Sequence, residues 1–163
     1  MSRTYQLIEE IDKAVEGGAY IAALALALTI PDMCCGINSS RKDYVNWYDT
    51  YALSGSKYAI RGDECYALRC SFLHQQDGNI DGQNIMNGRK QHIFKVIIPK
   101  DKNEIKVSYF IRDIELDEDI INVNADMLIM AIKQGYKKFH EDNPDWIEQH
   151  DNLILEEGFK QNG

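Results

Sequence analysis

The stretch AYIAALALALTI, residues 19–30, decides the fold class, because almost every residue in it is apolar. A helix that crosses a bilayer needs roughly 20 apolar residues, and this run is too short. A helix that is apolar on all sides belongs at the centre of a bundle. The sequence therefore predicts a buried helix here, broken or kinked at Pro31, in a cytoplasmic protein that makes no membrane contact.

Helical patterns continue on both sides of this run. Residues 4–15 place apolar side chains on one face, and Gly17 and Gly18 follow as a stop signal. Ser39 or Ser40 is placed to cap a helix of the segment RKDYVNWYDTYAL, and Asn124 is placed to cap the last one. The sequence predicts further helices over residues 41–53, 62–75 and 121–142.

The segment between residues 76 and 111 has a different character. It begins with a polar, Gly- and Asn-rich loop, followed by the β-branched and aromatic runs HIFKVIIP (92–99) and EIKVSYFI (104–111). These two runs predict an antiparallel β-hairpin. We therefore expect one mainly α domain over residues 1–163, a four- to five-helix bundle with the polar loop and the hairpin inserted at about 76–111.

Composition argues against a metal or cofactor site. The four cysteines form no CxxC pair, which favours free thiols over zinc ligands. Residues 77–82 match the first half of an EF-hand loop, but Gly88 stands where the bidentate glutamate is needed. We expect no metal and no cofactor. The net charge of −8, from 18 basic and 26 acidic side chains, disfavours promiscuous nucleic-acid binding.

The predicted helix 62–75 contains the two residues that suggest chemistry, Arg69 and His74. On a straight α-helix, five positions separate two side chains by roughly 140°. A histidine moves a proton near neutral pH, and an arginine stabilises charge on a phosphate. The opposing interpretation is structural: Arg69 pairs with Asp63, Glu64 or a carboxylate of another helix, and His74 caps the helix end.

The segment Arg69-Cys-Ser-Phe-Leu-His74 resembles the R-x4-H motif of the HEPN superfamily of small α-helical domains. The resemblance implies a homodimer that brings two such motifs to one cleft, and a metal-independent endoribonuclease with Arg69 and His74 as the catalytic pair. It covers mainly the helical N-terminal half. Cys70 departs from the family pattern, which often has a polar residue after the arginine, and so does the inserted hairpin.

Two functions stay open from the sequence. In the first, the protein cleaves RNA in a toxin–antitoxin or phage-defence setting. Its supporting residues would be Asp63 or Glu64, which orient Arg69, and Tyr66, which lies one turn before Arg69 on roughly the same face. Further phosphate contacts would come from a basic patch formed by Arg89, Lys90 and Lys95.

In the second function, the chain is a non-catalytic helical module that binds a partner protein or a nucleotide, and a phage- or plasmid-encoded inhibitor belongs to this class. The acidic net charge and the thiol at Cys70 favour it. An exposed strand edge would let such a module add a strand of a partner protein.

Overall fold

The computed structural model of the chain describes residues 3–36, 38–55, 60–75, 92–99 and 119–146, and it is mainly helical. The elements are the α-helices α1 (Arg3–Glu16), α2 (Tyr20–Ala27), α3 (Ile30–Cys35), α4 (Arg41–Trp47), α5 (Gly62–Cys70) and α6 (Ala125–Asp142), the π-helical turns η1 (Tyr48–Ala52) and η3 (Ser71–Gln75), the 3₁₀ turn η2 (Leu53–Gly55), and the strands β1 (His92–Ile97) and β2 (Asp119–Asn124).

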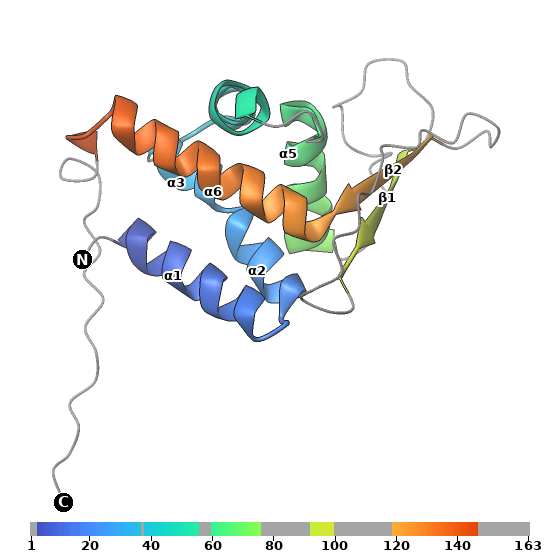
Figure 1. Cartoon of the computed structure of the whole chain (residues 1–163). Helices are drawn as coiled ribbons and strands as arrows, with labels where there is room; N and C mark the ends of the chain where they lie inside the picture. Colours follow the sequence, from blue (N-terminus) through green and yellow to red (C-terminus); the bar gives the residue numbers. More distant parts are fainter. Residues whose placement is uncertain (1–2, 37, 56–59, 76–91, 100–118, 147–163) are drawn as a thin grey trace, which may run out of the picture.

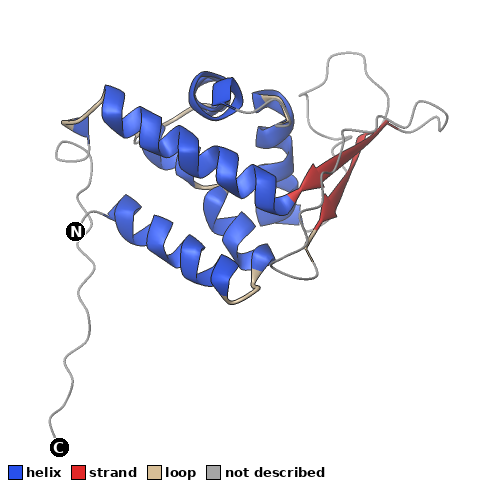
Figure 2. Cartoon of the chain, in the orientation of Figure 1, coloured by secondary structure: helices blue, strands red, loops and turns tan. Residues whose placement is uncertain are grey.

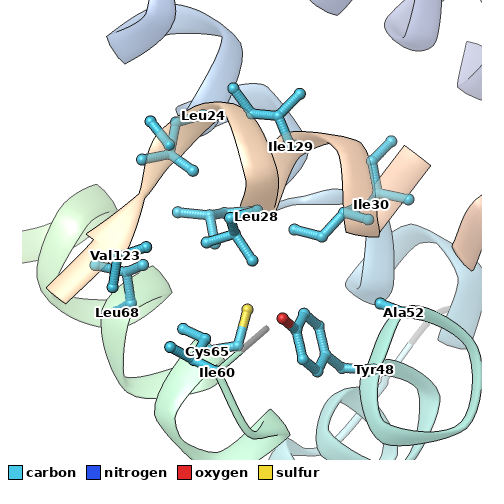
Figure 3. Packing of buried hydrophobic residues seen from close by; sticks show 14 of the residues in the cluster. Leu24, Leu28, Ile30, Tyr48, Ala52, Ile60, Cys65, Leu68, Val123 and Ile129 are labelled. Carbon is cyan, nitrogen blue, oxygen red and sulfur yellow. The ribbon is translucent and has the colours of Figure 1, made fainter. Parts of the chain in front are cut away.

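Helix α6 organises the bundle. It contacts α2, α3 and η1, while α1 packs on α2, and α4 packs on both α3 and α5 (Figure 1). The two strands lie at the end of the bundle where α6 begins (Figure 2). Buried side chains from all these helices form one apolar cluster, in which Leu28 lies near the Cys65 thiol and the Tyr48 hydroxyl (Figure 3).

The predicted break in the apolar run 19–30 is displaced, because it falls at Leu28 and Thr29, and Pro31 lies inside the next helix. Helix α2 ends at Ala27, and α3 begins at Ile30 with the proline in its first turn, where a missing N–H costs nothing. The expectation that this run is buried on all sides is wrong in part, because the side chain of Ile21 is 59% exposed. Uniform apolarity conceals which face of a helix meets its neighbours, so the sequence does not distinguish the exposed face of α2.

The predicted helix boundaries rest on caps that the structure confirms. The Ser40 hydroxyl accepts a hydrogen bond from the Asp43 N–H, and the Asp43 carboxylate accepts one from the Ser40 N–H. The Asn124 side chain accepts a hydrogen bond from the Met127 N–H at 3.2 Å. Gly18 ends α1 at a φ of 77°, a conformation that favours glycine.

The predicted antiparallel hairpin is wrong. Strand β1 pairs in parallel with β2, in a register that joins His92 to Asp119 and Ile97 to Asn124. The second predicted strand, 104–111, lies outside the described residues. Parallel strands need a long crossover connection, and the chain between β1 and β2 has that length. The helix predicted over residues 121–142 is also wrong at its start, because residues 121–124 belong to β2, the partner of β1.

Helix α6 crosses η1 at very short range. A Cβ built on Gly135 would lie 2.9 Å from the backbone nitrogen of Ala52 and 3.0 Å from its Cα. Only glycine permits this approach, because both obstructing atoms belong to the backbone. Through this crossing α6 contacts η1, which continues α4, and α4 packs on α5, the helix that contains Arg69.

Candidate functional site

Helix α5 contains Arg69, and two carboxylates accept hydrogen bonds from the backbone N–H groups at its start. Glu64 accepts a hydrogen bond from the Arg61 N–H at 2.9 Å, and Asp49 accepts one from the Gly62 N–H at 2.8 Å. The guanidinium of Arg61 lies 3.1 Å from Asp63 and 3.5 Å from Glu64. Both carboxylates proposed as supports for Arg69 therefore contact Arg61.

The carboxylate that contacts Arg69 comes from another helix. Asp32 of α3 places its Oδ2 at 2.6 Å from the Arg69 Nε, which is the third alternative that the sequence left open. The two side chains are 21% and 26% exposed for Arg69 and Asp32, respectively, so this ion pair is only partly screened by water. The pair joins the first turn of α3 to the last turn of α5.

Burial and charge act in opposition at this pair. Burial raises the pKa of Asp32 above its ordinary value, and the charge and hydrogen bonds of Arg69 and Ser39 oppose that rise. Burial lowers the pKa of Arg69, but Asp32 and Cys70 outweigh it, so the pKa of Arg69 is raised. Arg69 is therefore a permanent cation whose position depends on Asp32.

Two tyrosine rings also lie against the Arg69 guanidinium. The Arg69 Cζ lies 5.7 Å from the ring centroid of Tyr66 and 5.9 Å from that of Tyr44. The two rings meet edge to face at 5.3 Å. Tyr44 is fully buried and donates a hydrogen bond to the Leu28 carbonyl at 3.1 Å, so the position of its ring beside Arg69 is fixed. The prediction that Tyr66 lies beside Arg69 is confirmed.

Cys35 and Cys65 do not supply a ready nucleophile. Burial, with the charges of Asp43 and Asp32, raises the pKa of the Cys35 thiol to about 11. Burial likewise raises the pKa of Cys65, which is fully enclosed, to about 12. Only a thiolate attacks efficiently, and both thiols stay protonated near neutral pH. All four cysteines are free, as the sequence predicts.

The backbone changes its winding between Arg69 and His74. Helix α5 ends at Cys70 and continues as the π-helical turn η3, Ser71–Gln75. A π-turn closes hydrogen bonds five residues apart, so it brings backbone positions with that spacing nearer to one face than an α-helix does. The separation of about 140° expected for a straight α-helix therefore does not apply here. The side chain of His74 lies outside the described residues.

The predicted basic patch is described only at Lys95. This residue is exposed on β1, where its register partner is Asn122 of β2. Arg89 and Lys90 lie outside the described residues. A different cation comes to the site: the Cζ of Arg41, the first residue of α4, lies 5.9 Å from the Tyr66 ring centroid.

The sequence does not indicate that Asp32 and Tyr44 contact Arg69, or that Arg41 contacts Tyr66. Each lies on a different segment from α5, so no spacing rule connects them. Tyr44 carried a weak signal, because its helical spacing with other aromatic residues marked it as facing the core. Arg41 begins a predicted helix and carries no other signal, and the sequence predicts no helix at Asp32.

The described part of the chain contains neither a cluster of metal-ligating side chains nor a membrane-spanning helix. Residues 3–36, 38–55, 60–75, 92–99 and 119–146 contain no group of three His, Cys, Asp or Glu side chains arranged to hold a metal ion. The EF-hand-like segment 77–82 lies outside these ranges. None of the described helices is long and apolar enough to span a bilayer.

Comparisons with protein-family models, with curated proteins and with solved structures found no match for this chain. The resemblance of the segment from Arg69 to His74 to the HEPN motif therefore stays a prediction.

Proposed function

We propose that the protein is a metal-independent endoribonuclease of HEPN type that acts through Arg69 and His74. One observation carries this proposal: Arg69 is held by Asp32 and two tyrosine rings, yet its side chain keeps 21% of its surface exposed. A positioned, partly exposed guanidinium is what a reacting phosphodiester requires, because its fork matches two phosphate oxygens.

The chemistry needs only the RNA and proton transfers. The ribose 2′-oxygen attacks the adjacent phosphorus, the bond from phosphorus to the 5′-oxygen breaks, and a 2′,3′-cyclic phosphate remains. One group accepts the 2′-hydroxyl proton and another gives a proton to the leaving 5′-oxygen; we assign one of these two transfers to His74. Arg69 stabilises the negative charge that grows on the non-bridging oxygens. A homodimer would supply a second imidazole for the other transfer.

A non-catalytic phosphate- or nucleotide-binding module is the second candidate. The contact between Asp32 and Arg69 favours it, because a paired arginine serves structure as readily as chemistry. In this alternative the α5 face binds a phosphorylated ligand or a partner protein, and His74 transfers no proton.

A cleavage assay separates the two candidates. Purified wild type is incubated with total RNA in EDTA, beside Arg69→Lys, Arg69→Gln and His74→Gln. The matched control is Arg61→Gln, which removes an arginine with an ion pair from the other end of α5. We expect wild type and Arg61→Gln to leave 2′,3′-cyclic phosphate ends, and the other three variants to lose at least about 100-fold in rate.

The lysine variant sharpens the result, because it keeps the charge and loses the planar fork. Circular dichroism checks that each variant is folded. Equal cleavage by wild type, Arg69→Gln and His74→Gln would sink the endoribonuclease proposal. No cleavage by the wild type would favour the non-catalytic module instead.

A further inference from the structure

Asp32 presents a carboxylate to the guanidinium that is proposed to bind the reacting phosphate. Its Oδ2 lies 2.6 Å from the Arg69 Nε, and both of these atoms are buried. The Asp32 side chain nevertheless reaches the surface, because 26% of it is exposed. A ligand can therefore approach this carboxylate only at Oδ1, and a carboxylate oxygen accepts more than one hydrogen bond.

A phosphate bound by Arg69 would share one planar guanidinium with this carboxylate. The Asp32 contact uses Nε, and one N–H of Nη1 is directed to the Cys70 sulfur at 3.9 Å. The remaining N–H groups of the two terminal nitrogens suffice for two phosphate oxygens at about 2.7–2.9 Å. In a productive geometry the attacking oxygen lies about 3–3.5 Å from phosphorus. These short distances allow the attacking hydroxyl to meet the carboxylate beside Nε.

The charge balance around Arg69 favours a proton transfer to Asp32. Before the reaction the guanidinium faces two single negative charges, one on Asp32 and one on the phosphodiester. The attack adds a second negative charge to the non-bridging oxygens, and a proton taken up by Asp32 removes the first. Arg69 then stabilises the charge at the place where it develops, without a change in the total charge around it.

The ionisable groups around Asp32 leave this carboxylate as the one that titrates in the acid range. They are the Arg69 guanidinium and the phenol of Tyr66 on α5, the phenol of Tyr44 on α4 and the thiol of Cys35 on α3. Burial raises the pKa of both phenols and of the thiol, so all three stay neutral there. Burial also raises the pKa of Asp32, against the opposing charge of Arg69, and a raised pKa makes a carboxylate a better proton acceptor.

From this geometry we infer that Asp32 is the general base of the proposed reaction. Its Oδ1 accepts the proton of the ribose 2′-hydroxyl as the 2′-oxygen bonds to phosphorus, the bond to the 5′-oxygen breaks, and the imidazolium of His74 gives that oxygen its proton. The inference rests on the proposed function and adds to it a catalytic residue of α3, outside the R-x4-H segment. One subunit then contains both groups that transfer protons, and the second imidazole of a homodimer is not needed.

The pH dependence of cleavage tests this assignment. The substrate is a short RNA with one cleavable uridine and 2′-O-methyl riboses elsewhere, and kcat/KM is measured in EDTA from about pH 4 to pH 9. The matched control is Asp12→Asn, because Asp12 also pairs with a cation of another helix, Lys133 of α6. We expect the wild-type rate to fall on the acidic side as Asp32 takes up a proton. Asp32→Asn should lower the rate at neutral pH by about 100-fold or more and lose that fall, while Asp12→Asn should match the wild type.

A second substrate separates the base from the acid. With sulfur in place of the scissile 5′-oxygen, the leaving group departs as a thiolate and needs no proton. We expect this substrate to restore His74→Gln to within about tenfold of the wild type, and Asp32→Asn to remain at least about 100-fold slower than the wild type. Thermal unfolding shows whether the variants fold. Should Asp32→Asn fail to fold, Asp32→Ser takes its place in both assays.

The outcomes distinguish this inference from the proposed function. Cleavage by the wild type without a fall on the acidic side, or a fall that Asp32→Asn retains, overturns the assignment and leaves the endoribonuclease standing. Recovery of Asp32→Asn on the sulfur substrate, or equal losses for Asp12→Asn and Asp32→Asn, does the same. No cleavage by the wild type at any pH overturns both.

Discussion

The ion pair between Asp32 and Arg69 can be tested by a double-mutant cycle that reads stability and activity together. The variants are Asp32→Asn, Arg69→Gln and the double variant, which keep side-chain size while removing charge. Breaking a fully buried ion pair costs about 3–5 kcal/mol, whereas an exposed pair is worth about 0–1 kcal/mol. Because the two side chains are 26% and 21% exposed, we expect Arg69→Gln to cost about 2 kcal/mol. Asp32→Asn should cost less, because burial already raises the pKa of Asp32 and so disfavours its charged form.

Urea unfolding followed by tryptophan fluorescence measures these costs. With a slope of about 2 kcal/mol per molar urea, a loss of 2 kcal/mol lowers the midpoint by about 1 M. The double variant should lose about 1–2 kcal/mol less than the sum of the single losses, since either replacement already breaks the contact. The matched control is the pair formed by Asp12 and Lys133, which joins α1 to α6 and has a more exposed carboxylate; its coupling should stay within about 1 kcal/mol.

Activity then distinguishes positioning from packing. If Asp32 orients Arg69 for the phosphate, Asp32→Asn lowers kcat about 10-fold or more at a temperature where the variant is fully folded, and KM changes little. A structural role predicts wild-type kcat under the same conditions. Additive stability losses, with a coupling below about 0.5 kcal/mol, would refute the energetic importance of the contact.

Three further predictions concern the scaffold. Gly135→Ala should destabilise the protein by about 1–2 kcal/mol despite the better helix propensity of alanine, because the new Cβ meets the Ala52 backbone at 2.9 Å. The control Gln134→Ala, on the exposed face of the same helix, should change stability little. Urea unfolding measures both variants. The free energy of unfolding should fall as pH rises from about 9, where the Cys65 thiol of the unfolded chain ionises, toward the folded pKa of about 12. Cys65→Ala should reduce the slope of this fall by the equivalent of about one bound proton. An unchanged slope would contradict the assignment to Cys65. Ser40→Ala should cost about 1 kcal/mol through loss of the α4 cap, and thermal unfolding measures it.

Local sequence signals predicted most of the helices. The Ser40 and Asn124 caps and the stop at Gly18 each depend on residues within one turn of the feature they determine. The placement of Tyr66 beside Arg69 was equally local, because both lie on one face of α5. Such features appear in a single sequence, since no distant contact is needed to create them.

The strand pairing and the surroundings of Arg69 could not be predicted in this way. The partner of β1 lies beyond a long connection, and the apolar residues of 119–124 continue the helical pattern of the helix that Asn124 caps. Asp32 reaches Arg69 only because α3 and α5 both pack on α4, and Arg41 reaches Tyr66 for the same reason. The π-turn η3 likewise has no spacing signature in the chain.

By itself, the sequence determined the helical class, the caps and the presence of an arginine and a histidine five residues apart, because these depend on propensity and spacing along one segment. Only the tertiary structure decided which carboxylate neutralises Arg69, which second cation shares its tyrosine and which strand pairs with β1. The physical reason is that ion pairs, cation–π contacts and strand pairing act through space, and packing of the core chooses their partners.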